Sequence, residues 1–137
     1  MRYECTSIEA FVDSPDDRYD IITCMELLEH VPDPMRMVNE CARRLKPNGN
    51  IFFSTINRTA KAYALAVFSA EYLLKLLPRG THDYASFIKP SELARWGRAA
   101  GLEAREIRGM TYNPITRHAA LCDDVSVNFM AHLAPQN

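Results

Sequence analysis

At 137 residues the chain is long enough for one domain with its own core, and we expect a single domain over residues 1–137. Its composition, 47% apolar and 24% charged, is ordinary for a globular protein and argues against disorder. The net charge of −1 leaves no basic excess, so no nucleic-acid partner is expected.

The cysteines and the apolar segments indicate the compartment. The four cysteines are scattered without a CxxC spacing, which argues against a disulfide framework or a cysteine zinc site. The start of the chain carries no apolar run of the kind that a signal peptide needs, and the most apolar stretch, residues 62–77, is too short to span a bilayer. We therefore expect a cytoplasmic protein.

In chain order, the first half predicts a strand, a helix and a second strand. Residues 19–25 form a nearly continuous apolar and β-branched run, which indicates a strand buried on both faces. Asp33 and Pro34 suit the cap and the first turn of a helix from about Pro34 to Leu45, and residues 46–49 then form a turn. Residues 51–55 predict a second buried strand.

The second half predicts two helices followed by two strands. A long apolar helix is expected from about Ala60 to Leu77, and another from about Glu92 to Ala100, capped by Ser91. Residues 102–108 indicate a strand, and alternating apolar residues predict a last strand over 125–133 with one buried face. His132 lies on the other phase of that strand, where we expect exposure to solvent.

This order predicts an α/β fold that finishes with an antiparallel strand pair, since no helix separates the last two strands. In open α/β sheets, ligands lie beyond the carboxyl ends of the strands. The residues that follow Met25 and Thr55 are therefore the first place to look for chemistry.

Directly after Met25, two carboxylates and an imidazole are closely spaced. If residues 26–30 form a helical turn, then Glu26, Glu29 and His30 share one face at positions i, i+3 and i+4. Such a set suits Mg²⁺ or Mn²⁺ and does not exclude Zn²⁺. The spacing equally fits a solvated helix face on which His30 pairs with Glu26, and both interpretations stay open.

Four segments resemble the ubiquinone-biosynthesis O-methyltransferases, a family of class I S-adenosylmethionine-dependent methyltransferases. In chain order they read YDIITCMELLEHVPDP, LKPNGNIFFSTIN, GTHDYASFIKPSEL and GMTYNP. The first two motifs are widespread among class I methyltransferases, whereas the last two narrow the resemblance to this family.

The resemblance implies a seven-stranded, Rossmann-like sheet and methylation of a phenolic hydroxyl on a polyprenylated ring, a phenol or catechol, in ubiquinone biosynthesis. It implies that Met25 contacts S-adenosylmethionine and that Glu26, Glu29 and His30 are ligands of Mg²⁺. A cation beside the phenol would lower its pKa and orient its oxygen.

The family's glycine-rich cofactor loop has no counterpart in this sequence, so we expect the C-terminal portion of the domain, without the first two strands of the sheet. In that arrangement the strand at residues 19–25 has an unpaired edge, and we expect a homodimer through it. The competing interpretation is a non-catalytic, truncated α/β module that pairs with a partner through the same edge.

Two further features have alternative interpretations. His82 and Asp83 have three possible roles: a solvated pair in a loop, a catalytic base near the substrate hydroxyl, or a further ligand that completes the metal site. Aromatic and cationic side chains share one face of residues 60–79, including Lys61, Lys75 and Arg79. That face suits peripheral association with the anionic inner face of a membrane, and it equally suits a buried helix or a dimer contact.

Overall fold

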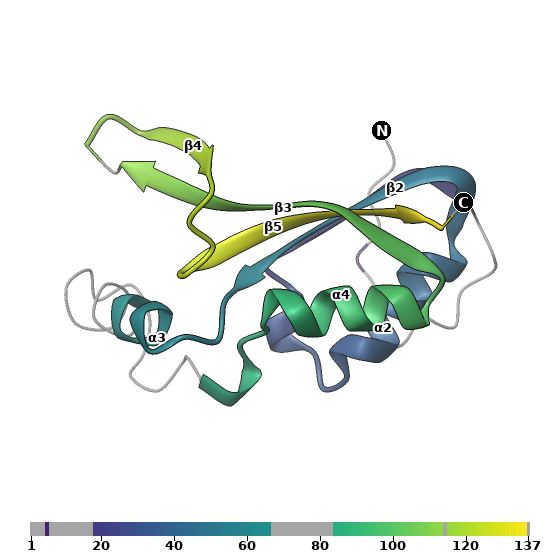
Figure 1. Cartoon of the computed structure of the whole chain (residues 1–137), viewed down its shortest axis with the longest axis horizontal. Coiled ribbons are helices and arrows are strands. Elements are labelled where there is room, and N and C mark those ends of the chain that lie inside the picture. Colours follow the sequence, from purple (N-terminus) through teal and green to yellow (C-terminus); the bar gives the residue numbers. More distant parts are fainter. Residues whose placement is uncertain (1–4, 6–17, 67–83, 114, 137) are drawn as a thin grey trace.

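A five-stranded sheet organises the molecule (Figure 1). The computed structural model describes residues 5, 18–66, 84–113 and 115–136. The strands are arranged in the order β1-β2-β5-β3-β4, with β1 and β2 parallel and every other neighbouring pair antiparallel. Their bounds are β1 Tyr19–Met25, β2 Leu45–Ile56, β3 Leu102–Asn113, β4 His118–Cys122 and β5 Asn128–Pro135.

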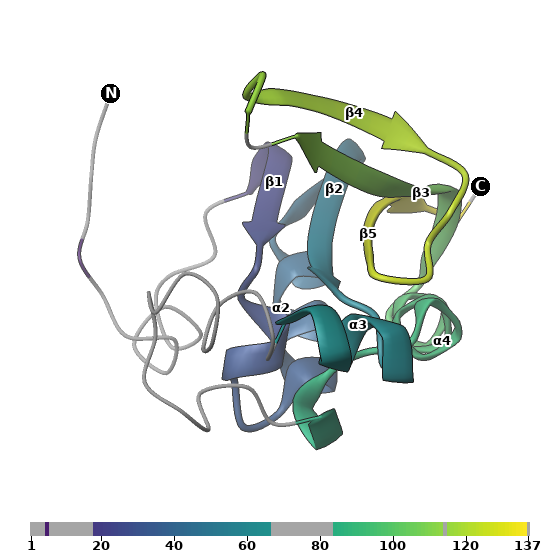
Figure 2. The ribbon, with the colours of Figure 1, turned by 90° about the vertical axis from the view of Figure 1, so that its left-hand side faces the viewer.

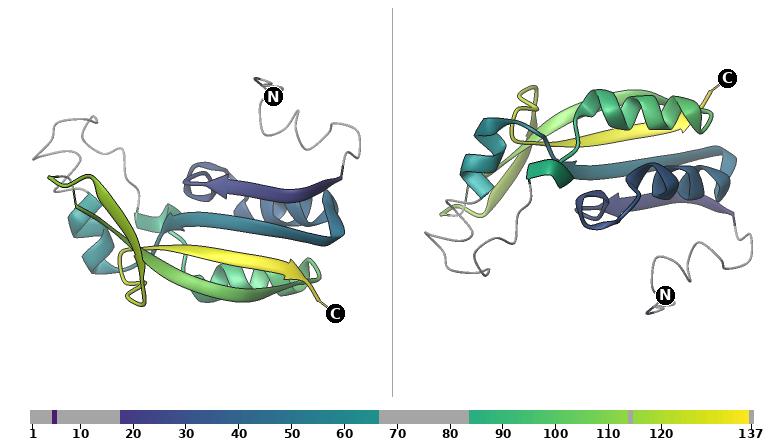
Figure 3. Two further views of the ribbon diagram at one scale, coloured as in Figure 1. Left: turned by 90° about the horizontal axis from the view of Figure 1, so that it is seen from above. Right: turned by 90° about the horizontal axis from the view of Figure 1, so that it is seen from below.

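Two helices, α2 (Pro34–Arg43) and α4 (Pro90–Ala99), lie against the same face of the sheet (Figures 1 and 3). The cap of α2 is the expected one, because Asp33 Oδ1 accepts a hydrogen bond of 2.9 Å from the Arg36 N–H and Pro34 opens the first turn. The short helix α3 (Ala60–Ala66) follows β2 and lies at the end of the sheet where β1 and β2 stop (Figure 2).

The core fills the space between these helices and the sheet. Its fully buried side chains come from alternate positions of the two central strands, Ile51 and Phe53 on β2 and Phe129, Ala131 and Leu133 on β5. They pack with apolar residues of α2 and α4. Each of these side chains other than that of Ala131 contributes about 1.5–3 kcal/mol by leaving water, so the apolar alternation on β2 and β5 fixes which face turns inward.

The expected α/β order and the antiparallel final pair are confirmed, with several corrections of detail. Helix α4 begins at Pro90, and its cap residue is Lys89 rather than the expected Ser91. The Glu92 carboxylate accepts a hydrogen bond of 2.9 Å from the Lys89 N–H. Leu45 belongs to β2 and not to the preceding helix, and β3 continues five residues beyond its expected end at Arg108, to Asn113. The last strand begins at Asn128 rather than at residue 125.

The strand β4 was not predicted at all. It pairs antiparallel with the far end of β3, from Gly109 opposite Cys122 to Asn113 opposite His118. The two strands form a hairpin that extends beyond the rest of the sheet (Figure 1). At the opposite side of the sheet, β1 has β2 as its neighbour and lies at the edge within the described residues. The expected burial of β1 on both faces is therefore wrong: Tyr19, Ile21 and Met25 are exposed. The pairing of β1 with a second chain stays a prediction.

Two expectations concern residues that the structure describes only in part. Of the helix expected over 60–77, residues 67–77 lie outside the described ranges, and in the described turn Ala62 is fully buried whereas Tyr63, expected in the core, is 40% exposed. In the described segments no helix is long and apolar enough to cross a membrane. All four cysteines are free, and burial is the main cause that raises the pKa of the Cys24 thiol to about 12.

Candidate functional site

A hollow of about 690 Å³ opens where β1 and β2 end. Both β2 and β3 run antiparallel to β5, so β3 runs in the same direction as β2. The carboxyl end of β3 therefore lies at this same side of the sheet. The wall is mostly apolar, and its polar side chains come from the first turn after β1, from β2 and from β5. The lining residues are Met25, Glu26, Ser54, Ile56, Ala62, Met110, Tyr112, Val127, Asn128 and Met130.

Glu26 leaves β1 in a left-handed backbone conformation, with φ of 47°. Non-glycine residues adopt this conformation at a cost of about 1–2 kcal/mol, so something must hold it. The Glu26 N–H donates to both the carbonyl oxygen and the Oγ of Ser54, each at 3.1 Å. The Ser54 hydroxyl donates in turn to Glu26 Oε1 at 2.6 Å. One serine on β2 therefore fixes both the backbone and the carboxylate of Glu26.

Glu29 is held by the next residue of the same strand. It is only 8% exposed, and its Oε2 accepts a hydrogen bond of 2.9 Å from the hydroxyl of Thr55, which is fully buried. Glu29 belongs to the 3₁₀ turn η1 (Leu28–His30), whose Leu28 packs into the core. Two successive hydroxyls of β2, facing opposite sides of the strand, thus each engage one of the two carboxylates.

The Glu29 carboxyl group is close enough to Glu26 to influence the pKa of Glu26. The pKa of Glu26 is raised, first because its carboxyl group is withdrawn from water, and further because Glu29 lies beside it. The Ser54 hydroxyl and the charge of His30 act in the opposite direction. Glu26 therefore keeps its proton to a higher pH than an ordinary glutamate does.

The expected helical face of Glu26, Glu29 and His30 is wrong in its geometry. The left-handed conformation of Glu26 and the 3₁₀ turn at 28–30 break the i, i+3, i+4 relation that a regular helix would give. Glu26 and Glu29 come together, but His30 points out into solvent as an exposed residue. Within the described ranges, no group of three or more His, Cys, Asp or Glu side chains is arranged to hold a metal ion.

The remaining predicted site residues fall in two classes. Met25, the expected contact of S-adenosylmethionine, lies on the wall of the hollow and is 42% exposed. Its contact with the cofactor stays a prediction. His82 and Asp83, the candidate catalytic base, lie outside the described residues.

The sequence did not single out Ser54 and Thr55 as site residues. Met110 and Tyr112, on the wall of the hollow, belong to the GMTYNP motif that contributed to the family resemblance, but their spacing indicated no role for them. A signal for the first two was available: they end a buried strand, and β-strand termini of open α/β sheets bear ligand sites. Met110 and Tyr112 lie on the part of β3 that was not predicted as strand, so their position at the hollow did not follow from the predicted elements.

Polar contacts attach α3 to the loop before β5, and so form one side of the hollow. Lys61 Nζ lies 2.9 Å from Asp124 Oδ2 and donates to Ser126 Oγ at 2.7 Å. Thr59 Oγ1 donates to the Ser126 carbonyl oxygen at 2.6 Å, and the Asn57 side chain donates to the Val125 carbonyl oxygen at 2.7 Å. Lys61, expected on a membrane-facing cationic surface, has its charge compensated by Asp124.

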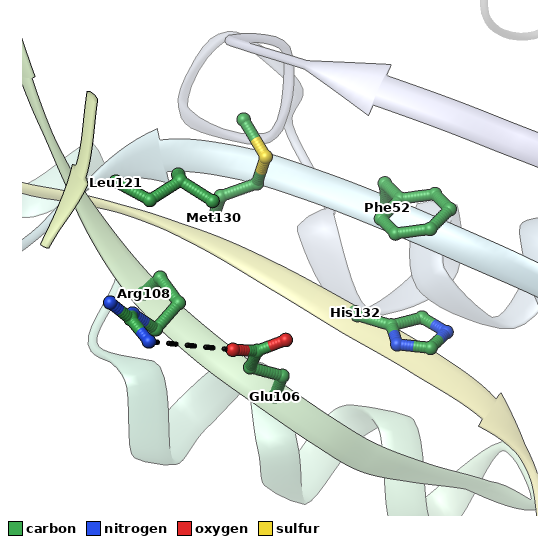
Figure 4. A pocket seen from close by; sticks show the side chains of 6 residues that line it. All are labelled: Phe52, Glu106, Arg108, Leu121, Met130 and His132. Carbon is green, nitrogen blue, oxygen red and sulfur yellow. Dashed lines mark ion pairs between the residues drawn. The ribbon is translucent and has the colours of Figure 1, made fainter. Parts of the chain in front are cut away.

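A second, smaller hollow of about 80 Å³ lies on the sheet face opposite α2 and α4 (Figure 4). His132 lines it, half-buried rather than exposed as expected, because its ring stacks on Phe52 with centroids 4.8 Å apart and its Nε2 lies 2.7 Å from Asn50 Oδ1. Across the hollow, Arg108 Nη1 lies 3.6 Å from Glu106 Oε1. The contacts of His132 with Phe52 and Asn50 join β5 to β2 and account for His132 as a structural residue.

Comparison with protein families gives a match to a model described as a methyltransferase domain, over residues 4–107. Three curated relatives carry the name ubiquinone biosynthesis O-methyltransferase. The protein of Thiobacillus denitrificans is 59% identical over 128 residues, that of Saccharophagus degradans 58% over 131, and that of Pseudomonas putida strain W619 54% over 130. The matches cover 93–95% of this chain and 55–56% of the relatives, so the chain spans about half the length of these proteins.

Solved structures share the fold at low sequence identity. An S-adenosylmethionine-dependent methyltransferase of Thermotoga maritima, a possible histamine N-methyltransferase, superposes with a TM-score of 0.64 at 16% identity, covering 92% of this chain and 61% of that one. Magnesium protoporphyrin IX methyltransferase of Synechocystis, solved with bound SAH, gives a TM-score of 0.58 at 13% identity, covering 91% of this chain and 48% of that one. These likenesses concern the fold alone.

Proposed function

The chain belongs to the methyltransferase domain family, and from this membership we propose that the protein transfers a methyl group from S-adenosylmethionine to a phenolic hydroxyl of a polyprenylated ring in ubiquinone biosynthesis. The observation that carries the proposal is the identity of 59% to the ubiquinone biosynthesis O-methyltransferase of Thiobacillus denitrificans, over 93% of this chain.

The large hollow fits an aromatic acceptor beside the cofactor. Its wall is built from apolar and sulfur-containing side chains, with the Glu26–Ser54 pair at one point and Asn128 at another. Apolar walls with a few fixed polar groups are the usual form of a small-molecule site. We assign Met25 to the cofactor side, and Met110 and Tyr112 to the ring. Placing the hydroxyl oxygen near the methyl donor would supply most of the rate acceleration.

Divalent-cation assistance is a finer part of the proposal, and the residues fit it in part. Glu26 and Glu29 place two carboxyl groups near each other, and carboxylate oxygens are the ligands that a hard cation such as Mg²⁺ prefers. His30 contributes charge nearby but does not join them in a three-residue group. When bound there, Mg²⁺ would lower the pKa of the phenol and orient its oxygen. The role of His82 and Asp83 as a base belongs to the same proposal.

Methyl transfer by the protein tests the proposal directly. We expect radioactive methyl from S-adenosylmethionine to appear on the oxygen of a short-chain prenylated catechol. The matched control is the same ring with that hydroxyl already methylated, which should accept nothing. Transfer to an amine such as histamine, with none to the catechol, would contradict the proposed acceptor.

Peripheral association with the inner membrane face extends the proposal, because a polyprenylated substrate resides in the bilayer. Since Lys61 is paired with Asp124, the described part of residues 60–79 contributes little free positive charge. We therefore expect Lys61→Glu to leave co-sedimentation with anionic vesicles unchanged, whereas Lys75→Glu with Arg79→Glu reduces it, at about 1 kcal/mol for each cation near the surface. Equal sedimentation of all variants would remove this segment as the membrane contact.

A further inference from the structure

Asn128 brings to the large hollow a side-chain donor that the fold does not use. It is the first residue of β5, lines the hollow and is half-buried. Its Oδ1 accepts a hydrogen bond of 3.1 Å from the Met110 N–H. Because an N–H can donate only to the oxygen of a side-chain amide, this contact fixes which atom of Asn128 is Oδ1 and which is Nδ2. The Nδ2 group therefore points away from the Met110 backbone.

The oxygen of the Asn128 side chain has a structural role, whereas its NH2 group has none. β3 pairs with β5 as far as Arg108 opposite Met130, and from Gly109 onwards it pairs with β4. Where β3 leaves β5, the Asn128 oxygen takes the place of a backbone acceptor for the Met110 N–H. An aspartate would accept the same hydrogen bond, so this contact does not account for the NH2 group, for which the described residues offer no acceptor. On the wall of a mostly apolar hollow, such a donor is available to a bound molecule.

The position of Asn128 in the sheet assigns its donor to the methyl acceptor rather than to the cofactor. Phe129 is buried in the core, so its neighbours Asn128 and Met130 face the other side of the sheet, where both line the hollow. Met25, which we assign to the cofactor side, belongs to β1, and β2 separates β1 from β5. Two strand spacings amount to about 10 Å, so the Asn128 backbone is well separated from that of Met25.

Asn128 is also separated from the other polar group on the wall of the hollow. It lies opposite Ile56 in the β2–β5 register, and Ser54, whose hydroxyl donates to Glu26, is two residues earlier on β2. Diagonal neighbours of this kind lie about 7–8 Å apart, a separation that one substituted aromatic ring can span. A ring bound between them would present one oxygen at the side of Glu26 and a second oxygen to the Asn128 N–H.

We propose that Asn128 is an acceptor-binding residue that selects a ring with a second oxygen substituent, to which its side-chain N–H donates while the first hydroxyl receives the methyl group. The inference rests on the proposed function and deepens it, because a phenolic hydroxyl is present in a simple phenol and in a catechol alike. A site that donates to an oxygen of its substrate discriminates against the analogue without that oxygen, since the donor then loses its partner. We therefore expect the protein to prefer the catechol.

The test is methyl transfer by the protein to two rings, a short-chain prenylated catechol and the corresponding phenol, which keeps only the hydroxyl that is methylated. Asn128→Asp keeps an oxygen for the Met110 N–H but replaces the donor with a negatively charged acceptor. We expect it to raise the KM for the catechol by about 10-fold or more, with a smaller change in kcat, because a binding contact is lost. The matched control is Asn113→Asp: this exposed asparagine also accepts from backbone N–H groups, those of Ile115 and Thr116, but it does not line the hollow. Its KM should equal that of wild type.

The phenol separates a lost contact from general damage to the hollow. Wild type should have a kcat/KM for the phenol about 10-fold or more below that for the catechol, and Asn128→Asp should lose most of this preference. General damage would instead lower both rates and keep their ratio. A wild type that uses both rings equally, or a variant that keeps the wild-type preference, overturns the inference and leaves the proposed function intact. A wild type that methylates neither ring contradicts the proposed function itself and overturns the inference with it.

Discussion

The substitution Glu29→Gln is expected to lower kcat/KM for methyl transfer by about 100-fold, equivalent to about 2.7 kcal/mol of lost transition-state stabilisation. Glutamine keeps the shape of the side chain, and its amide oxygen can still accept the Thr55 hydroxyl that now binds Oε2. The charge is what disappears. Steady-state kinetics across a range of Mg²⁺ concentrations measures the effect, and partial recovery at high Mg²⁺ is expected.

Two comparisons make this result informative. Glu103→Gln removes an exposed carboxylate of β3 that pairs with Arg105, and it should leave the rate unchanged. His30→Ala separates two models of the site: a three-ligand face requires a loss as large as that of Glu29→Gln, whereas the observed geometry predicts a smaller one. Unchanged activity in Glu29→Gln would show that the carboxylate pair is structural.

The sequence placed β1 and β2 correctly, but it predicted burial correctly only for β2, since most of β1 is exposed. The apolar runs at 19–25 and 51–55 lie within β1 and β2, and the antiparallel final pair followed from the lack of a helix between the last two strands. β4 was missed because its residues, His118 to Cys122, carry two alanines and no β-branched side chain. Residues 118–122 form a strand because they pair with β3. The residue pattern of one segment carries no information about such pairing.

The site was predicted in its residues but not in its geometry. The i, i+3, i+4 spacing predicted that Glu26, Glu29 and His30 share one helical face. That prediction assumes that consecutive residues have the same backbone conformation. The left-handed turn at Glu26 depends instead on Ser54, 28 residues away in the chain and adjacent only through the β1–β2 pairing. His132 was misjudged for a similar reason: the ring of Phe52 and the amide of Asn50 reach it from a strand 80 residues earlier.

The largest effect on stability is expected at a glycine of β3. A Cβ atom on Gly109 would lie 1.9 Å from the carbonyl oxygen of Asp124 and 2.7 Å from its carbonyl carbon. Both are backbone atoms, so no rotation of a side chain can relieve the contact, and the loop between β4 and β5 must move. Overpacking costs about 1–3 kcal/mol in general, and we expect Gly109→Ala to reach the upper end, about 3 kcal/mol.

The same displacement should reach the hollow, because Asp124 holds Lys61 of α3, while Ser126 beside it accepts from Thr59. Moving this loop loosens the side of the hollow that contains Ala62, so Gly109→Ala is expected to raise the KM for the acceptor in addition to lowering the urea midpoint of unfolding. Gly101→Ala is the matched control: its φ of 78° strains an alanine by about 1–2 kcal/mol, but nothing lies within 4 Å of its added Cβ. Gly101→Ala should therefore lower the midpoint less and leave KM unchanged. If Gly109→Ala unfolds at the wild-type urea concentration, the loop before β5 moves freely, and its contacts with α3 do not shape the hollow.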